Sequence, residues 1–216
     1  MYSRKLALSQ AKQYRTCPPP SVADNPSHKK YLQQHFSICP YCSGLVMEDE
    51  KNWRGLTKEI RKLFPATLPT PSLNKILQGQ LRYIRSDLGR WREGYFYNPP
   101  LVLVLEDVGE ISDDLWVAQT YHDIYLAGPG DLILSAEQTG TDELFVECWN
   151  TYRLNTKDLD PPLGQISLDI MEAIEILRED SDAYPVWAFQ TKPLTNHDVR
   201  IYFRELEAEV ARIFSL

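Results

Sequence analysis

The sequence predicts an α+β protein in which a small helical module precedes an antiparallel β-barrel with C-terminal helices. Three observations predict this arrangement: cysteines clustered near the N-terminus, a proline-rich run near residue 70, and strand patterns followed by helix patterns. We place the module at residues 1–64, a linker at 65–76 and the barrel domain at 77–216. The length of 216 residues and the 25% of charged side chains are typical of a globular protein.

Charge is distributed unevenly between the two parts. Residues 1–65 carry 11 Lys and Arg against 5 Asp and Glu, whereas the rest of the chain carries 12 against 25. A basic segment can contact nucleic acid, but the acidic remainder would repel a phosphate backbone. We therefore expect a protein partner and do not expect a nucleic-acid partner.

The sequence also indicates the cellular compartment. No apolar run reaches the roughly 18 residues that a membrane span requires, and the first 15 residues lack the apolar stretch of a signal peptide. We therefore expect a cytoplasmic protein that does not contact a membrane. In a chain without secretion signals, clustered cysteines favour a metal site over disulfides.

The cluster of cysteines includes a recognisable spacing of metal ligands. His35, Cys39 and Cys42 form the pattern H-x3-C-x2-C. His35 and Cys39 are four residues apart, so at the end of a helix an imidazole and a thiolate can reach one ion at about 2.0–2.3 Å. We expect Pro40 to stop this helix and to form a tight turn that brings Cys42 back to the same ion.

A closed zinc site needs a fourth ligand. Cys17, which three prolines follow, is the best candidate, and His28 is its competitor. Four Cys and His ligands leave no coordination position for water, so the site would be structural and not catalytic. We therefore expect one structural Zn per chain at Cys17, His35, Cys39 and Cys42.

At these residues the sequence resembles the bacterial zinc-binding anti-sigma factors and their zinc-finger relatives. Their pattern is an upstream Cys or His and then a helix that ends in H-x3-C-x2-C, and the resemblance covers roughly Cys17 to Met47. It implies a small helical zinc domain and a non-enzymatic regulatory protein whose partner is a sigma factor or a related regulator of transcription. A zinc module joined to a barrel would also suit an accessory protein of a bacterial antiviral defence locus, including type III-E CRISPR loci that carry a sigma factor.

An amphipathic helix is predicted after the motif, between residues 47 and 64. Its apolar side chains recur at spacings of three and four, and its charges occupy the other face. This apolar stripe either packs on the module or the second domain, or binds a partner. We assign a partner-binding role to four residues of the stripe: Trp53, Leu56, Ile60 and Leu63.

The proline run at 65–71 cannot form a helix or a central strand, and it marks the domain boundary. After it, five segments have strand patterns and two have helix patterns, an order that predicts an antiparallel barrel covered by helices. The strands are expected at 79–85, 101–105, 115–120, 131–134 and 144–149, and the helices at 167–178 and 195–214. We expect Thr195 and Asp198 to form a capping box for the last helix.

The second part of the chain, from Leu77 to Leu177, resembles the SH3-like PemK/MazF toxin barrels. The resemblance is carried by four segments: Gly79 to Leu81, the apolar strand after Pro99 and Pro100, Val146 to Asn150, and Leu163 to Ser167. Those toxins cleave RNA with an Arg just before the central apolar strand and a later Ser or Thr, because a phosphodiester needs a cation and a proton-transfer partner.

The residues for that chemistry are mostly absent. Asn98 stands where the Arg is expected, Thr120 matches the hydroxyl, and Arg90 and Arg92 would have to replace the cation. His122 and Asp123 have no accompanying nucleophile motif, and Cys148 is expected to be a buried, inert thiol. We therefore predict no catalytic residues and a protein that is not an enzyme. The alternatives are a toxin-like endoribonuclease and a nucleic-acid-binding zinc protein.

Overall fold

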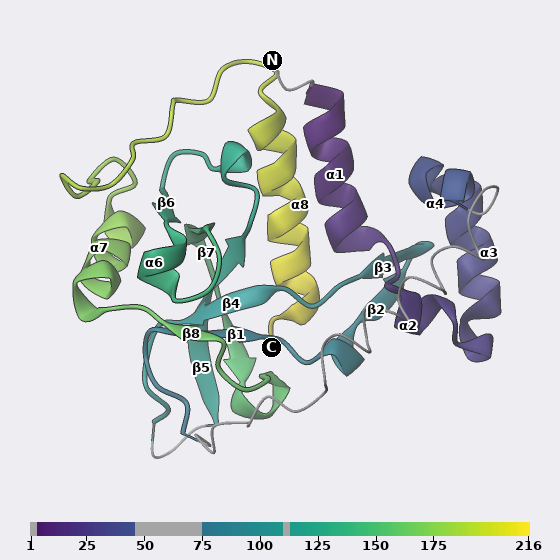
Figure 1. Cartoon of the computed structure of the whole chain (residues 1–216), viewed down its shortest axis with the longest axis horizontal. Coiled ribbons are helices and arrows are strands. Elements are labelled where there is room, and N and C mark those ends of the chain that lie inside the picture. Colours follow the sequence, from purple (N-terminus) through teal and green to yellow (C-terminus); the bar gives the residue numbers. More distant parts are fainter. Residues whose placement is uncertain (1–3, 46–74, 110–112) are drawn as a thin grey trace.

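The computed structural model describes residues 4–45, 75–109 and 113–216 (Figure 1). The predicted helix that carries Trp53, Leu56, Ile60 and Leu63 lies outside these residues, as does the proline run at 65–71, so both stay predictions. Within the described residues, no helix is both long enough and apolar enough to cross a membrane.

Six strands form one antiparallel sheet in the order β6-β7-β5-β4-β1-β8, and this sheet curls into a half-barrel (Figure 1). Its longest strands, β5 (Asp114–Tyr121) and β7 (Leu144–Asn155), pair at its centre, with an irregularity of register after Ala118. The other four are β1 (Gln80–Tyr83), β4 (Leu101–Val104), β6 (Asp131–Leu134) and β8 (Gly164–Gln165). The predicted α+β class is confirmed, whereas the SH3-like detail stays a prediction.

Helices bury both faces of the sheet. In β4, Leu101 and Leu103 pack with α7 (Leu168–Glu179), whereas the alternate Val102 and Val104 pack with α8 (Val199–Phe214). This alternation follows from the two-residue period of side chains in a strand. A strand that is apolar on both faces therefore reads as a continuous hydrophobic run, as 101–105 does.

The N-terminal helices extend this helical layer and continue away from the sheet. Helix α1 (Arg4–Thr16) lies beside α8, and the short helices α2 (Pro20–Ala23), η1 (Pro26–His28), α3 (Lys29–Ile38) and α4 (Pro40–Leu45) follow it (Figure 1). We call residues 17–45 the N-terminal lobe. A separate hairpin of β2 (Arg90–Arg92) and β3 (Tyr95–Tyr97) stands between this lobe and the sheet.

The predicted elements correspond to β1, β4, β5, β6, β7, α7 and α8, with shifts of a few residues at most ends, but β7 continues to Asn155, well beyond the predicted end at Trp149. The last helix begins at Val199 and not at Thr195, because the side chain of Asp198 accepts a hydrogen bond from the backbone N–H of Arg200 and so acts as the N-cap itself. Sequence patterns missed α1, the hairpin and β8. The short connections η2 (Ser86–Leu88), η3 (Ile124–Leu126), α6 (Ala136–Thr139) and η4 (Thr156–Asp158) complete the described structure.

Candidate metal centre

Four side chains from different segments of the N-terminal lobe meet at one point. Cys17 follows the end of α1, His35 lies in the last turn of α3, Cys39 lies between α3 and α4, and Cys42 lies in α4. Their ligand atoms all lie within 4.8 Å of one another, and the sulfur atoms of Cys17 and Cys39 are 3.6 Å apart. Since all four cysteines of the chain are free thiols, nothing covalent occupies these sulfurs.

Pro40 acts differently from the prediction. It does not form a tight turn but begins a second helix, α4, where its missing N–H is no loss and its fixed φ suits the first helical position. Cys39 is the extended residue between the two helices, and its N–H donates to the carbonyl of His35. The helix therefore still ends before Pro40, and Cys42 still returns to the cluster, one turn into α4.

The imidazole of His35 is oriented for coordination. It is completely buried, and because a carbonyl oxygen only accepts hydrogen bonds, its Nδ1–H donates to the carbonyl of Gly94, at 2.9 Å. In the tautomer with its proton on Nδ1, Nε2 carries a lone pair, and Nε2 is buried with no hydrogen-bond partner among the described residues. An unpaired buried acceptor is costly, whereas a metal ion would use its lone pair, and metal-bound histidines commonly donate their other N–H in this way.

The thiols of the cluster share protons unequally. A hydrogen bond with Cys17, with a smaller contribution from His35, lowers the pKa of Cys42 to about 5. The same contact with Cys42, together with burial, raises the pKa of Cys17. The thiolate is the form that binds metal, and the close contact of these thiols favours a thiolate within the group.

The donor set fits zinc. Three sulfurs and one imidazole nitrogen form a closed tetrahedral set, and sulfurs bound to one zinc at about 2.3 Å would lie about 3.8 Å apart. The 3.6 Å between Cys17 and Cys39 is close to that separation. His28, the alternative fourth ligand, is not part of the cluster, since its Nδ1 faces the carbonyl of Val22 at 3.3 Å.

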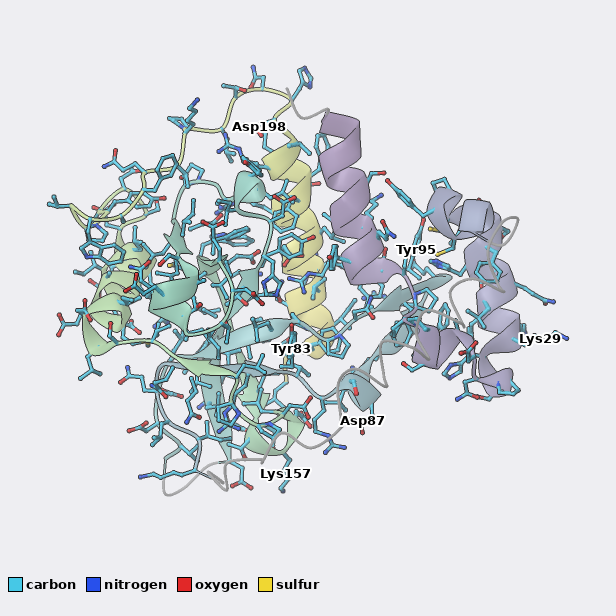
Figure 2. All side chains as sticks on the ribbon, viewed as in Figure 1. Lys29, Tyr83, Asp87, Tyr95, Lys157 and Asp198 are labelled. Carbon is cyan, nitrogen blue, oxygen red and sulfur yellow. The ribbon has the colours of Figure 1, made fainter. Side chains whose placement is uncertain are left out.

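Aromatic rings surround His35. The rings of Phe36, Trp91 and Tyr95 lie with their centroids 6.0–6.3 Å from the imidazole, and Tyr95 lies beside the lobe in Figure 2. Tyr31 stacks on Trp91 from the solvent side at 5.5 Å. This apolar surrounding limits the access of water to the cluster and strengthens a charged metal–thiolate set.

The residues considered for RNA cleavage are not brought together as a catalytic group. Thr120 is buried in β5, and its hydroxyl donates to the carbonyl of Leu101 at 2.9 Å. Arg90 donates to the carbonyl of Ile213 at the end of α8, and Arg92 is exposed on the hairpin. Asn98, which stands where the toxins have an Arg, instead binds the carbonyls of Tyr14 and Cys17.

A buried polar network, which sequence patterns missed, joins α1 to α8 and the sheet. Arg15 donates two hydrogen bonds to the carboxylate of Glu207, at 2.9 and 2.7 Å, and a third to the carbonyl of Thr120 at 3.0 Å. Gln119 donates to the same carboxylate at 2.7 Å and accepts from the hydroxyl of Tyr152. Glu207 lies within the apolar stripe of α8. A charged residue at a position expected to be buried was the sequence signal that could have indicated this network.

Two further acids and a thiol are buried on β6 and β7. Burial, together with the neighbouring Glu207, raises the pKa of the Glu147 carboxyl group well above its usual value. Burial also raises the pKa of Asp131 to about 7, although the Arg204 guanidinium opposes this shift. Burial raises the pKa of the Cys148 thiol, in agreement with the expected inert residue.

Comparison with known proteins finds similar chains among solved structures. No protein-family model matches the sequence, and no curated protein matches it. Among solved structures, the chain is similar to an endoribonuclease in complex with its cognate antitoxin from mycobacterial species, with a TM-score of 0.38 and 16% sequence identity. The match covers 52% of this chain and 97% of the other.

One prediction requires correction after this comparison. We predicted that the chain is not an enzyme, but the similar structure is an endoribonuclease, and this finding contradicts the prediction. We therefore do not maintain it. The two-part division at residues 64 and 77 stays a prediction, although contacts of α1 with α8 and of His35 with Gly94 cross that division.

Proposed function

We propose that this chain is a regulatory zinc protein that acts by binding another protein. The observation that carries the zinc centre is the buried, unpartnered Nε2 of His35 within a group of three thiols. The four ligands fill the coordination of the ion, so zinc supplies structure and no reactive water. Its role is to hold the helices of the N-terminal lobe together and against the hairpin.

The protein-binding role is supported by an exposed apolar loop between α7 and α8. Tyr184 and Ala188 of this loop pack on the core, whereas Val186 is fully exposed, Phe189 is 67% exposed and Trp187 is 47% exposed. Adjacent exposed apolar side chains of this kind mark interaction sites, and Trp is prominent among interface hot spots. We name Val186, Trp187 and Phe189 the apolar loop.

The charges beside the apolar loop define its partner. The second half of α7 and the residues after it carry four acidic side chains, Glu175, Glu179, Asp180 and Asp182, of which Glu175 forms an ion pair with Arg178. A protein segment with basic side chains around an apolar anchor complements this surface. The N-terminal resemblance makes a sigma factor the first partner to test.

Replacing both aromatic residues of the apolar loop should abolish partner capture. The change Trp187→Ala with Phe189→Ala removes the exposed anchors, and we expect at least a 30-fold loss of affinity, or about 2 kcal/mol, because truncated hot-spot residues cost this much or more. The measurement is titration of the zinc-loaded chain with sigma factors from the same genome.

The matched control is Tyr125→Ala, which removes an aromatic side chain of similar exposure, 77%, from a different loop. This variant should bind as the unchanged chain does. Full binding by the double variant would show that the contact lies elsewhere, for example at Trp53, Leu56, Ile60 and Leu63.

A second candidate is RNA cleavage, the activity of the toxin-like class that the barrel resembles. One observation favours an anionic partner: residues 4–45 carry six Lys and Arg against a single acid, Asp24. Lys29 and Lys30 are exposed at the start of α3, and they directly precede the exposed Tyr31, which stacks on Trp91. Cations beside a stacking ring are a common way to hold single-stranded RNA.

For this candidate, the zinc-loaded chain should bind and cut a single-stranded RNA of about 20 nucleotides. The changes Lys29→Ala and Lys30→Ala together should reduce the slope of log affinity against log salt by about 1.4, because each contacted phosphate contributes about 0.7. Arg178→Ala, which removes a cation on α7, should leave the slope unchanged. RNA that is neither bound nor cut at low salt would exclude the candidate.

A further inference from the structure

The strand β3 carries contacts to two of the four metal-ligand residues, one at each end. Gly94, just before β3, accepts the hydrogen bond from the Nδ1–H of His35 at 2.9 Å. Asn98, just after β3, donates its Nδ2–H to the carbonyl of Cys17 at 2.8 Å. One strand of the hairpin therefore fixes the ring of one ligand and the backbone of another.

A side chain at Gly94 would require side chains of the ligand helix α3 to move. Its φ of +84° is in the left-handed region, which disfavours any side chain. A Cβ at this position would lie 2.8 Å from Cδ1 of Ile38 and 3.1 Å from Cγ of Gln34, both on α3. The absence of a side chain lets the carbonyl of Gly94 approach His35 closely.

Asn98 also holds the end of α1. Its side chain donates to the carbonyl of Tyr14 at 2.9 Å, and its backbone N–H donates to the carbonyl of Arg15 at 2.9 Å. The last carbonyls of a helix have no partner within the helix, so these bonds act as a cap. Cys17 follows this capped end directly.

Arg15 ties the same end of α1 to the interior of the protein. It lies two residues before Cys17, and its guanidinium binds the buried carboxylate of Glu207 in a bidentate ion pair with a shortest distance of 2.7 Å. It also stands over the ring of Tyr121, at 4.7 Å from the ring centre. The end of α1 is thus held by Cys17 at the cluster, by Asn98 on the hairpin and by Glu207 on α8.

We propose that a metal ion at the cluster clamps α1 onto the sheet and α8, with Gly94 and Asn98 as its positioning residues. The inference rests on the proposed zinc centre and names what that centre controls. An ion bound to the cluster would link Cys17 to His35, Cys39 and Cys42. Of these, His35 is hydrogen-bonded to Gly94, at the start of β3. Without the ion, among the described contacts of Cys17, Asn98 remains as its tie to the hairpin.

Linkage follows from this geometry. If metal binding favours the docked position of α1, then docking of α1 favours metal binding by the same factor. Metal occupancy would thereby regulate whether α1 covers Glu207 of α8 and the adjacent Gln119 and Thr120 of β5. A change at Asn98, which touches no ligand atom, should therefore weaken metal binding.

The first experiment measures zinc affinity by competition with a chromophoric chelator. Asn98→Ala should weaken zinc binding at least 10-fold, which is the usual effect of losing a contact that orients a metal ligand. Asn25→Ala is the matched control, since Asn25 caps η1 in the same lobe and does not contact the cluster. It should change the affinity less than twofold. Gly94→Ala tests the other end of β3 and should weaken binding in the same direction.

A cobalt spectrum separates positioning from the loss of a ligand. Cobalt-loaded Asn98→Ala should keep the absorption of a tetrahedral site with three thiolates, at the intensity of the unchanged chain once saturated. A changed spectrum would mean that the ligand set itself is altered, and it would overturn the positioning role.

Hydrogen exchange of the unchanged chain tests the clamp without any substitution. Zinc addition to the metal-free protein should slow exchange at least 10-fold in α1 and in the part of α8 around Glu207, whereas α7 should not change. If one zinc ion binds per chain and hydrogen exchange in α1 stays the same, the proposed clamping of α1 is wrong, whereas the proposed zinc centre is right. If no zinc binds, the proposed centre itself fails. This measurement decides the question even if Asn98→Ala does not fold.

Discussion

Replacing Cys39 with serine should remove the metal centre and unfold the N-terminal lobe. Among the lobe residues whose burial the structure describes, only Leu32, His35 and Cys39 are buried. So small an interior cannot hold helices in place, and in zinc modules metal binding supplies about 10 kcal/mol or more of the folding free energy. We expect less than 0.1 Zn per chain by elemental analysis. We also expect circular dichroism to show a loss of total helix content that corresponds to the residues of α3 and α4.

Cys148→Ser is the matched control for this change. Cys148 is also a buried free thiol, but it lies in β7 and packs with the core on the α7 side. This variant should keep one Zn per chain and an unchanged lobe. The zinc centre would be disproved if Cys39→Ser and His35→Ala both retained the metal, or if the purified chain held no metal and chelators changed nothing.

Replacing Arg15 with alanine should destabilise the zinc-loaded protein by about 3–5 kcal/mol. The change leaves the carboxylate of Glu207 buried without its cation, and breaking a buried ion pair from one side costs this much. Gln119 still donates one hydrogen bond to the carboxylate of Glu207, but a neutral amide does not compensate a buried charge. The free energy of unfolding is measured by urea titration with zinc in excess.

Arg85→Ala is the control for this second prediction. Arg85 also makes a bidentate contact with a carboxylate, that of Asp87, but both side chains are exposed to solvent. Exposed pairs contribute little because water and salt screen them, so this variant should unfold almost as the unchanged chain does. Equal effects of the two substitutions would show that the Arg15 pair is not buried in solution.

Local sequence patterns were sufficient for the elements that bury apolar side chains at regular spacing. The runs at 101–105 and 131–134 appear as β4 and β6. Both faces of β4 pack against helices, and alternate residues of β6, Leu132 and Leu134, pack in the core with α7. Helices α7 and α8 were visible for the same reason, as apolar stripes at spacings of three and four. The hairpin of β2 and β3 was not, because its strands are three residues long and its turn, at Glu93 and Gly94, has no marked pattern.

Residue types and spacing also determined the candidate metal ligands, because a thiol or an imidazole can be recognised wherever it stands. The fourth ligand was left open between Cys17 and His28, and only the fold separates them, since it brings the end of α1 to the cluster and turns His28 towards Val22. Tertiary structure alone placed Gly94 and Asn98 beside the ligands and Glu207 beside Arg15, 192 residues away in the sequence. Such contacts join residues that are distant along the chain, and their energy comes from burial and close approach, which no local pattern of residues records.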